Sequence, residues 1–238
     1  MTSKQQILSI DIGVRNLAMW VEEFDGEKLQ EFKKQYKTIN PKLVDNNLPS
    51  EAYKTFLDNF LLTSSKTIWA DKIDLCEDEK VINKTKNHMI ILNNNILFNV
   101  IKQFDKRRDI LINVDTIVIE RQLKDNPNAQ VIQNHIHAYL LHQYGLSKNV
   151  VIFDSCHKTR VLGCPKKVAT TGAGEDKGKM VKINKTFRKK WTTNLTRRIM
   201  FDRKDKTFYN FVFEQNKSKA DDLSDTFCQA CAYVLLNL

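Results

Sequence analysis

The stretch from residue 115 to residue 153 constrains the fold most, because its pattern predicts a strand, a helix and a second strand in succession. Asp115–Glu120 (DTIVIE) and Asn149–Phe153 (NVVIF) are short and almost continuously apolar, as expected of strands buried on both faces. Between them, the Asn-Pro pair that opens Asn126–Tyr144 begins an amphipathic helix, and Gly145 ends it. A unit of this kind belongs to a sheet flanked by helices.

The residues before this unit predict further strands. Gln6–Gly13 (QILSIDIG) alternates and is rich in β-branched side chains, and Leu17–Phe24 (LAMWVEEF) continues as a second strand before an Asp25-Gly26 turn. A third strand is expected around Leu29–Thr38. Together with the two buried strands, these segments predict an α/β fold built on a mixed, five-stranded sheet.

No internal repeat or linker divides the chain, so we expect one domain over residues 1–238, with a helical insertion at about residues 40–114. The remaining expected elements are helices at Glu51–Leu62, His88–Phe104, Asn184–Phe201 and Asp221–Leu236, and a glycine-rich loop at Gly163–Gly178.

The distribution of charge predicts a polyanionic partner. The chain carries a formal net charge of +10, and residues 158–206 hold 16 Lys and Arg against 4 Asp and Glu. About one fifth of the chain therefore contains more than the whole net charge. A solvated basic face is the alternative, but this concentration favours binding to nucleic-acid phosphates.

The five cysteines are odd in number and scattered, which is typical of a reducing compartment rather than a disulfide framework. Cys228 and Cys231 are spaced like zinc ligands, but they lie in an apolar helical stretch without a second pair, which favours buried core thiols. No apolar run is long enough to span a bilayer, and the opening MTSKQQ leads into a strand rather than a signal-peptide core. A soluble, intracellular protein is expected.

Four acidic residues stand out because each lies within or at the end of an element expected to be buried, where an unpaired charge is costly. They are Asp11, Glu120, Asp222 and Asp225. The spacing of three puts Asp222 and Asp225 on one helix face, whereas Asp221 points elsewhere. Each acid alone is explained by a turn cap, a strand end or a helix N-cap. As a cluster flanked by basic sequence, they supply the hard oxygen ligands of two-metal phosphodiester hydrolysis.

In this order the acidic motifs resemble those of the ribonuclease-H-like Holliday junction resolvases, which include RuvC and the poxvirus and fungal mitochondrial resolvases. Ile10–Met19 (IDIGVRNLAM) resembles the first-strand signature of that group, Val118–Gln122 (VIERQ) its fourth-strand glutamate motif, and Lys219–Phe227 (KADDLSDTF) its terminal-helix pair. The match is closer to the viral and mitochondrial branch than to the bacterial one.

The resemblance implies a ribonuclease-H-like fold and a Mg²⁺-dependent endodeoxyribonuclease that resolves four-way junctions by paired, symmetric cuts during DNA recombination and repair. It assigns Asp11, Glu120, Asp222 and Asp225 as catalytic residues that bind two Mg²⁺ ions per site, with Mn²⁺ as a substitute. The group also has a lysine after its fifth strand and another in the following basic helix. Lys158 and Lys189 are the nearest candidates, although Ser155–Lys158 (SCHK) lacks the proline expected there.

Paired cuts across a branch point need two identical sites, so a two-fold homodimer on branched DNA is expected. Asn126–Tyr144 is the candidate interface because its apolar residues cover more than one stripe, although burial against the sheet is an equal alternative. These residues are Val131, Ile132, Ile136, Tyr139, Leu140 and Leu141. The residues expected to contact DNA are Arg15, Lys158, Lys166, Lys167, Arg188, Lys189 and Lys190.

Three other functions fit part of the sequence. A ribonuclease H acting on RNA–DNA hybrids would share the carboxylates and the metal. An actin-like ATPase or sugar kinase would use Asp11-Ile12-Gly13 as a phosphate-binding hairpin, but a second glycine-rich phosphate loop is missing from a chain with seven glycines. A catalytically inert junction-binding protein would not need all four carboxylates.

Overall fold

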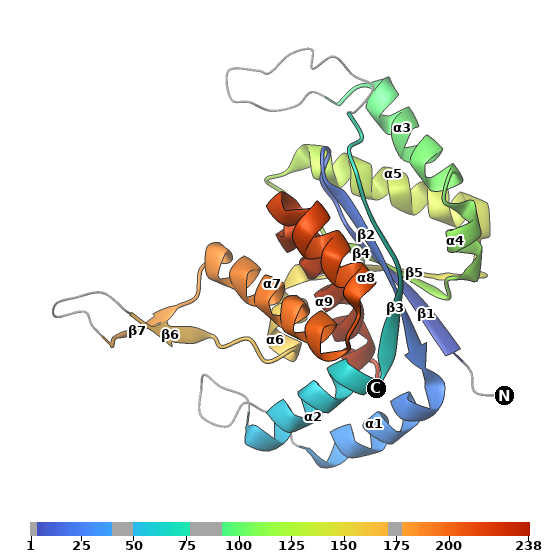
Figure 1. Cartoon of the computed structure of the whole chain (residues 1–238). Coiled ribbons are helices and arrows are strands. Elements are labelled where there is room, and N and C mark those ends of the chain that lie inside the picture. The colour runs from blue at the N-terminus through green and yellow to red at the C-terminus, as the bar shows by residue number, and fades with distance from the viewer. Residues whose placement is uncertain (1–3, 40–49, 77–91, 171–177) are drawn as a thin grey trace.

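The computed structural model describes residues 4–39, 50–76, 92–170 and 178–238. Its main sheet contains β1 (Lys4–Asp11), β2 (Leu17–Asp25), β3 (Ser65–Ile73), β4 (Thr116–Glu120) and β5 (Asn149–Phe153). The strands lie in the order β3-β2-β1-β4-β5 (Figure 1). β2 pairs antiparallel with β1 and β3, whereas β4 pairs parallel with β1 and β5. The predicted α/β class with a mixed, five-stranded sheet is confirmed.

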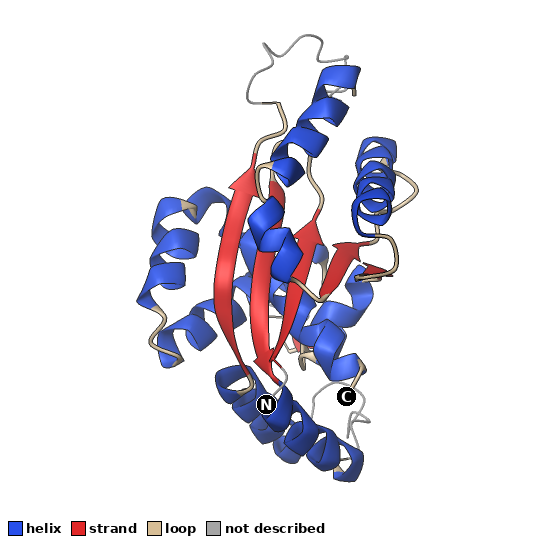
Figure 2. Ribbon diagram, turned by 90° about the vertical axis from the view of Figure 1, so that its right-hand side faces the viewer, coloured by secondary structure: helices blue, strands red, loops and turns tan. Residues whose placement is uncertain are grey.

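Helices cover both faces of this sheet (Figure 2). They are α1 (Gly26–Thr38), α2 (Glu51–Thr63), α3 (Asn94–Asp105), α4 (Arg108–Asn113), α5 (Pro127–Tyr144), α6 (Ser155–Val161), α7 (Lys185–Asp202), α8 (Lys206–Asn210) and α9 (Ala220–Leu236). A π-helical turn (Phe211–Gln215) and a 3₁₀ turn (Lys217–Lys219) connect α8 to α9, and β6 (Lys167–Ala169) and β7 (Met180–Lys182) form a separate two-stranded sheet. Within the described ranges, none of the helices is long and apolar enough to cross a membrane.

The alternation of side chains along β1 divides the interior into two hydrophobic layers. Ile7 belongs to the layer formed with α1, α2, α7 and α9, whereas Leu8 and Ile10 belong to the layer formed with α3, α4 and α5. Because the period of a strand is two residues, Asp11 faces the same side as Ile7. The last residue of β1 therefore points towards the layer that contains α9.

The expected strand at Leu29–Thr38 is wrong, because these residues form most of helix α1. Asp25 caps the helix by accepting hydrogen bonds from the backbone N–H groups of Glu27 and Lys28. Leu29, Phe32 and Tyr36 are spaced by three and four residues, which is a helical period, and all pack against the hydrophobic layer beneath α1. The expected Asp25-Gly26 turn is the start of this helix.

The third strand on this side of the sheet is β3, which lies inside the expected helical insertion at residues 40–114. That expectation is corrected, because the segment supplies an edge strand as well as α2, α3 and α4. β3 has only Thr67 and Ile73 buried, and so it lacks the apolar alternation that would have revealed it. Residues 88–91 of the expected helix His88–Phe104 lie outside the described residues.

The expected loop at Gly163–Gly178 is also corrected in part, because Lys167–Ala169 forms β6 and pairs with β7. Residues 171–177 of that loop lie outside the described residues. The predicted helices at Asn184–Phe201 and Asp221–Leu236 correspond to α7 and α9.

The expected core thiols are confirmed, since Cys228 and Cys231 are fully buried in α9. Burial raises the pKa of the Cys228 thiol to about 12, which keeps it protonated at neutral pH. The aromatic residues after α7 also join the core, as Phe213 is buried and Phe208 packs against Trp20.

Candidate functional site

Asp11 and Glu120 are brought together by the parallel pairing of β1 and β4. Ile10 pairs with Ile119, and each strand ends at the next residue. Parallel neighbours end at the same edge of a sheet, so the two carboxyl groups lie side by side there. Gly13 closes the turn after β1, where a Cβ atom would lie only 2.8 Å from the carbonyl oxygen of Asn16. The glycine of the first-strand motif therefore permits the tight turn beside Asp11.

Helix α9 brings two more carboxylates to this edge. It packs against β1 and β2, and its first turns carry Asp222 and Asp225. One turn after Asp225, the buried Gln229 donates hydrogen bonds from Nε2 to the carbonyl oxygens of Ile10 (3.3 Å) and Val118 (3.1 Å). Gln229 thus fixes α9 to the two strands that end in Asp11 and Glu120.

The four predicted carboxylates line one cleft with a volume of about 610 Å³. The cleft is also lined by polar and basic side chains from the loops after β1 and β4, from α6, from the start of α7 and from the turn before α9. They include Asn16, Arg121, Gln122, Lys158, Lys185, Arg188, Lys189 and Lys219. The sequence therefore predicted the carboxylate members of one continuous site.

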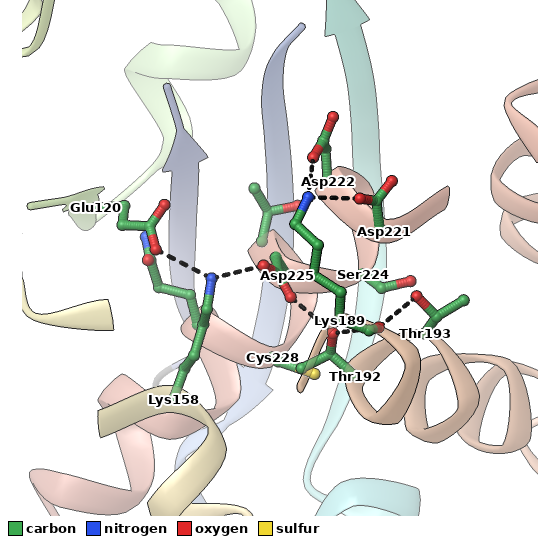
Figure 3. Close-up of polar contacts among 12 residues, drawn as sticks. Glu120, Lys158, Lys189, Thr192, Thr193, Asp221, Asp222, Ser224, Asp225 and Cys228 are labelled. Carbon is green, nitrogen blue, oxygen red and sulfur yellow. Dashed lines mark hydrogen bonds and ion pairs between the residues drawn. The ribbon is translucent and has the colours of Figure 1, made fainter. Parts of the chain in front are cut away.

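Lys158 is the central cation of this cleft (Figure 3). Its Nζ atom lies 3.1 Å from Glu120 Oε1 and 2.9 Å from Asp225 Oδ2, and its side chain is only 7% exposed. Lys158 is one of the residues that the sequence predicts to contact DNA. The structure places its ammonium group among the carboxylates of the cleft.

A second lysine, Lys189 of α7, pairs with the acidic residues at the start of α9 (Figure 3). Its Nζ atom contacts Asp222 Oδ1 at 3.2 Å and also binds the carboxylate of Asp221. Asp222 lines the carboxylate cleft, whereas Asp221 lines a neighbouring groove along α7. The two adjacent aspartates therefore share one lysine partner, although they line different hollows.

Asp11 and Glu120 share a hydrogen bond between their carboxyl groups in a buried environment. Burial and the neighbouring negative charge of Glu120 raise the pKa of Asp11 well above its usual range. Burial opposes ionisation of Glu120 too, but the hydrogen bond from Asp11 and the charge of Lys158 lower its pKa. The last proton of the pair is therefore released at a higher pH than from a separate surface carboxylate.

The remaining charges follow from the same neighbours. Burial disfavours a charged Lys158, but Glu120 and Asp225 outweigh that effect and raise the lysine pKa. Burial and the negative charge of Asp221 raise the pKa of Asp222. With Asp125, the whole lining of the cleft holds five acidic residues against six Lys and Arg residues, so the carboxylate cluster is surrounded by cations.

This donor set fits Mg²⁺, which prefers carboxylate oxygens, and burial together with the neighbouring charge of Glu120 raises the pKa of Asp11. Across the described parts of the chain, no three His, Cys, Asp or Glu side chains are already arranged to hold a metal ion. The ammonium group of Lys158 explains this, because it lies between Glu120 and Asp225.

Sequence reasoning missed two uncharged residues that hold the carboxylates in place. Thr192 of α7 is fully buried and donates a hydrogen bond to Asp225 Oδ1 at 2.7 Å, and Gln229 joins α9 to the sheet. The signals were present as polar residues in apolar positions. Gln229 follows Asp225 by one helical turn, and Thr192 and Thr196 recur on one face of a basic helix.

The expected DNA contacts other than Lys158 lie in four places. Arg188 and Lys189 line the cleft, and Lys190 lines the groove along α7. Lys166 and Lys167 are exposed at the base of the β6–β7 sheet, which projects from the body of the protein (Figure 1). Arg15 does not line the cleft, because its guanidinium group lies 3.4 Å from Asp74.

Comparisons with known proteins give relatives in invertebrate viruses. No family model matches the chain. The chain is 28% identical over 230 residues to Uncharacterized protein 97L of Invertebrate iridescent virus 3. This alignment covers 95% of this chain and 98% of the relative. The chain is also 34% identical over 126 residues to Uncharacterized protein 170L of Invertebrate iridescent virus 6. This alignment covers 51% of this chain and 50% of that protein.

Among solved structures, the chain is similar to the Fowlpox virus resolvase crystallised with its substrate Holliday junction DNA. The similarity covers 98% of this chain and 99% of the resolvase, with a TM-score of 0.50 and 15% sequence identity. The β3-β2-β1-β4-β5 sheet and its flanking helices are the basis of the match. The resemblance inferred from the three acidic motifs is therefore confirmed at the level of fold, and the chain has the fold of the RuvC-like poxvirus resolvase.

Proposed function

We propose that this chain is a Mg²⁺-dependent endonuclease that cuts four-way DNA junctions. The observation that carries the proposal is the convergence of Asp11, Glu120, Asp222 and Asp225 in one cleft whose rim is basic. These acids come from three separate parts of the sequence. Their convergence supports a shared chemical role.

The four carboxylates would hold the divalent ions. Bound Mg²⁺ neutralises charge on the attacking and leaving oxygens of a phosphodiester and activates water as the nucleophile. Lys158 holds the positive charge between Glu120 and Asp225 before DNA binds. On release from these partners, its ammonium group donates to a phosphate oxygen of the substrate, and Thr192 keeps Asp225 in a fixed orientation.

The substrate follows from charge and shape. The rim of the cleft carries Lys185, Arg188 and Lys219, which suit a phosphate backbone. A four-way junction is supported by the acidic motifs and by the fold shared with a resolvase that was crystallised with such DNA. An uncharged small substrate would make no use of this rim.

The test compares substrates directly. Purified protein is incubated with labelled four-way junction, linear duplex, RNA–DNA hybrid and ATP, each with and without Mg²⁺. The proposal predicts Mg²⁺-dependent cuts on opposite strands of the junction and little cleavage of linear duplex. Preferential cleavage of the hybrid would instead indicate a ribonuclease H, ATP hydrolysis alone an ATPase, and junction binding without cleavage an inert binding protein.

The active unit that we propose is a two-fold homodimer, since paired cuts need two copies of the cleft. In α5, Ile132, Ile136 and Leu140 are fully buried within the protein, whereas Val131 and Leu141 are 45% and 42% exposed. On α3, which packs beside α5, the large apolar residue Phe98 is 65% exposed. These three exposed side chains supply the apolar surface for a second copy.

Sedimentation with and without junction DNA tests this assembly. Val131→Glu together with Leu141→Glu should give monomers, whereas Phe201→Glu, which also changes an exposed apolar residue, should leave the dimer intact. Dimers that combine wild-type protein with Asp11→Asn should nick one strand only. A monomeric wild-type protein on the junction, or paired cuts by the mixed dimers, would disprove the paired-cut assembly.

A further inference from the structure

A second hollow of the surface runs along α7, next to the carboxylate cleft. It has a volume of about 580 Å³ and is lined by Lys185, Thr186, Lys189, Lys190, Thr193, Asn194, Arg197 and Asp221. Lys185 and Lys189 line both the groove and the cleft, so the two hollows are continuous at the start of α7. None of the expected DNA contacts lies beyond Lys190, and the far half of this groove had no assigned role.

The lining of the groove is suited to anions. Lys185, Lys189, Lys190 and Arg197 bring four cations, and Thr186 and Asn194 add neutral donors. The single carboxylate, Asp221, already pairs with Lys189. The groove therefore combines a net positive charge with hydrogen-bond donors, which is the composition that binds phosphates.

Arg197 is held in place at the far end of the groove. Its guanidinium carbon lies 4.7 Å from the ring centroid of Phe213, so the planar group stacks on the aromatic face. The next residue, Arg198, lies on another side of α7 and binds Asp58 at 2.7 Å. Two adjacent arginines thus differ in role, one lining the groove and the other tying α7 to α2.

The length of the groove distinguishes a polymer from a small anion. From Lys185 to Arg197 the helix advances by about 18 Å at roughly 1.5 Å per residue. One strand of a duplex advances by about 3.4 Å per nucleotide along its axis, so the groove matches about five nucleotide steps. A single phosphate or nucleotide would contact only part of this surface.

We propose that the groove along α7 binds the sugar-phosphate backbone of one DNA arm as it leaves the carboxylate cleft, with Arg197 as its far anchor. This inference rests on the proposed function, because it takes DNA as the polymer. It adds a binding surface beyond the cleft, and it predicts that affinity for DNA depends on residues that are remote from the carboxylates.

The matched pair Arg197→Ala and Arg198→Ala tests the groove. Both changes remove one arginine charge from α7, but only the first removes it from the groove. Binding of a catalytically inactive protein to labelled junction is measured over a range of salt concentrations. Arg197→Ala should weaken binding and reduce the slope of log affinity against log salt by about one, and Arg198→Ala should change neither.

A gain of affinity provides a second test that misfolding cannot imitate. Asn194→Lys adds a cation to the groove, whereas Gln143→Lys adds one to the exposed surface of α5. Asn194→Lys should tighten junction binding and steepen the salt slope by about one, and Gln143→Lys should have a clearly smaller effect. Equal effects of the two additions, or equal losses for the two arginine variants, would overturn the groove assignment.

The outcomes separate this inference from the proposed function. If wild-type protein cuts junctions but the Arg197 and Arg198 variants bind DNA equally well, the assignment of DNA binding to the groove is wrong, and the proposed nuclease activity is retained. If DNA binding depends on Arg197 but no DNA substrate is cut with Mg²⁺, the assignment of DNA binding to the groove is retained, and the proposed nuclease activity is wrong. Binding of an acidic peptide in preference to DNA would overturn the groove as a DNA surface.

Discussion

The hydroxyl of Thr192 donates a hydrogen bond of 2.7 Å to Oδ1 of Asp225, and the other carboxylate oxygen, Oδ2, lies 2.9 Å from Lys158 Nζ. Both oxygens of Asp225 are therefore fixed, one by a neutral donor from α7 and one by a cation from α6. Thr192 is fully buried, so water does not replace its hydroxyl. The orientation of this carboxylate depends on the packing of α7 against α9.

Thr192→Val should reduce cleavage by roughly 10- to 100-fold, because it removes the donor that orients Asp225 while keeping the side-chain shape. The concentration of Mg²⁺ needed for half-maximal cleavage should rise, and junction affinity should stay close to wild type. Thr192→Ser, which keeps the hydroxyl, should restore most of the activity.

Thr196→Val is the matched control for this variant. Thr196 lies one turn further along α7, is equally buried, and approaches the Ser224 carbonyl oxygen and Cys228 rather than a carboxylate. The Thr196→Val variant should be less stable than wild type, but the Mg²⁺ concentration needed for half-maximal cleavage should not change. The same shift in both variants would show that Thr192 acts through packing alone.

Asp11→Asn should raise the melting temperature of the metal-free protein, with a gain that grows as pH rises. The pKa of Asp11 is raised in the folded state by burial and by Glu120, so the unfolded chain releases this proton more readily. Above the unfolded pKa, stability is therefore lost as pH increases towards the raised folded pKa. The asparagine removes this loss, which thermal unfolding in a chelator between pH 4 and pH 8 measures.

Asp221→Asn should change the melting temperature in the opposite direction. Burial opposes ionisation of Asp221, but the pairing with Lys189 lowers its pKa in the folded protein. The charged carboxylate therefore stabilises the folded state above the pKa of the unfolded chain, and this stabilisation is lost as the pH falls through the folded-state pKa. The asparagine should lower the melting temperature at neutral pH by a small amount, because the pair is partly exposed. Two variants with changes of the same sign would refute this assignment of charges.

Replacing Lys166 and Lys167 by alanine should weaken junction binding and reduce the slope of log affinity against log salt by about two, if both contact phosphates. Replacing Lys33 and Lys34, a lysine pair of α1 that lines neither the cleft nor the groove, should leave the slope nearly unchanged. An unaltered slope for the first pair would place DNA away from the β6–β7 sheet.

The sheet and its carboxylates could be predicted because their signals are local. Buried strands are short and apolar, and Asp11 and Glu120 are the last residues of such strands, so parallel pairing places them together. Lys158 was harder to place, because nothing in its neighbourhood distinguishes a buried lysine from a surface one. Its position depends on α6 packing beside α9, a contact between distant parts of the chain.

The missed elements have the same cause. β3 is an edge strand with mostly half-exposed residues, and α1 buries only Phe32, so the apolar pattern of each element is weak. Thr192 and Gln229 act only through contacts 33 and 111 or more residues away along the chain. A single sequence gives the residues that make such contacts, but it does not show which of them contact each other in the folded protein.

The most direct measurement of the central claim is cleavage of a labelled four-way junction by Asp11→Asn, Glu120→Gln, Asp222→Asn, Asp225→Asn and Asp221→Asn, each with Mg²⁺ and with junction affinity measured in parallel. The account predicts that the first four variants bind the junction but do not cut it, because metal ligation serves the chemistry and the basic surface serves affinity. Asp221→Asn, whose side chain lines the groove rather than the cleft, should keep most of its activity. Near-wild-type cleavage by any of the first four would remove that residue from the site, and cleavage by all four would contradict the account.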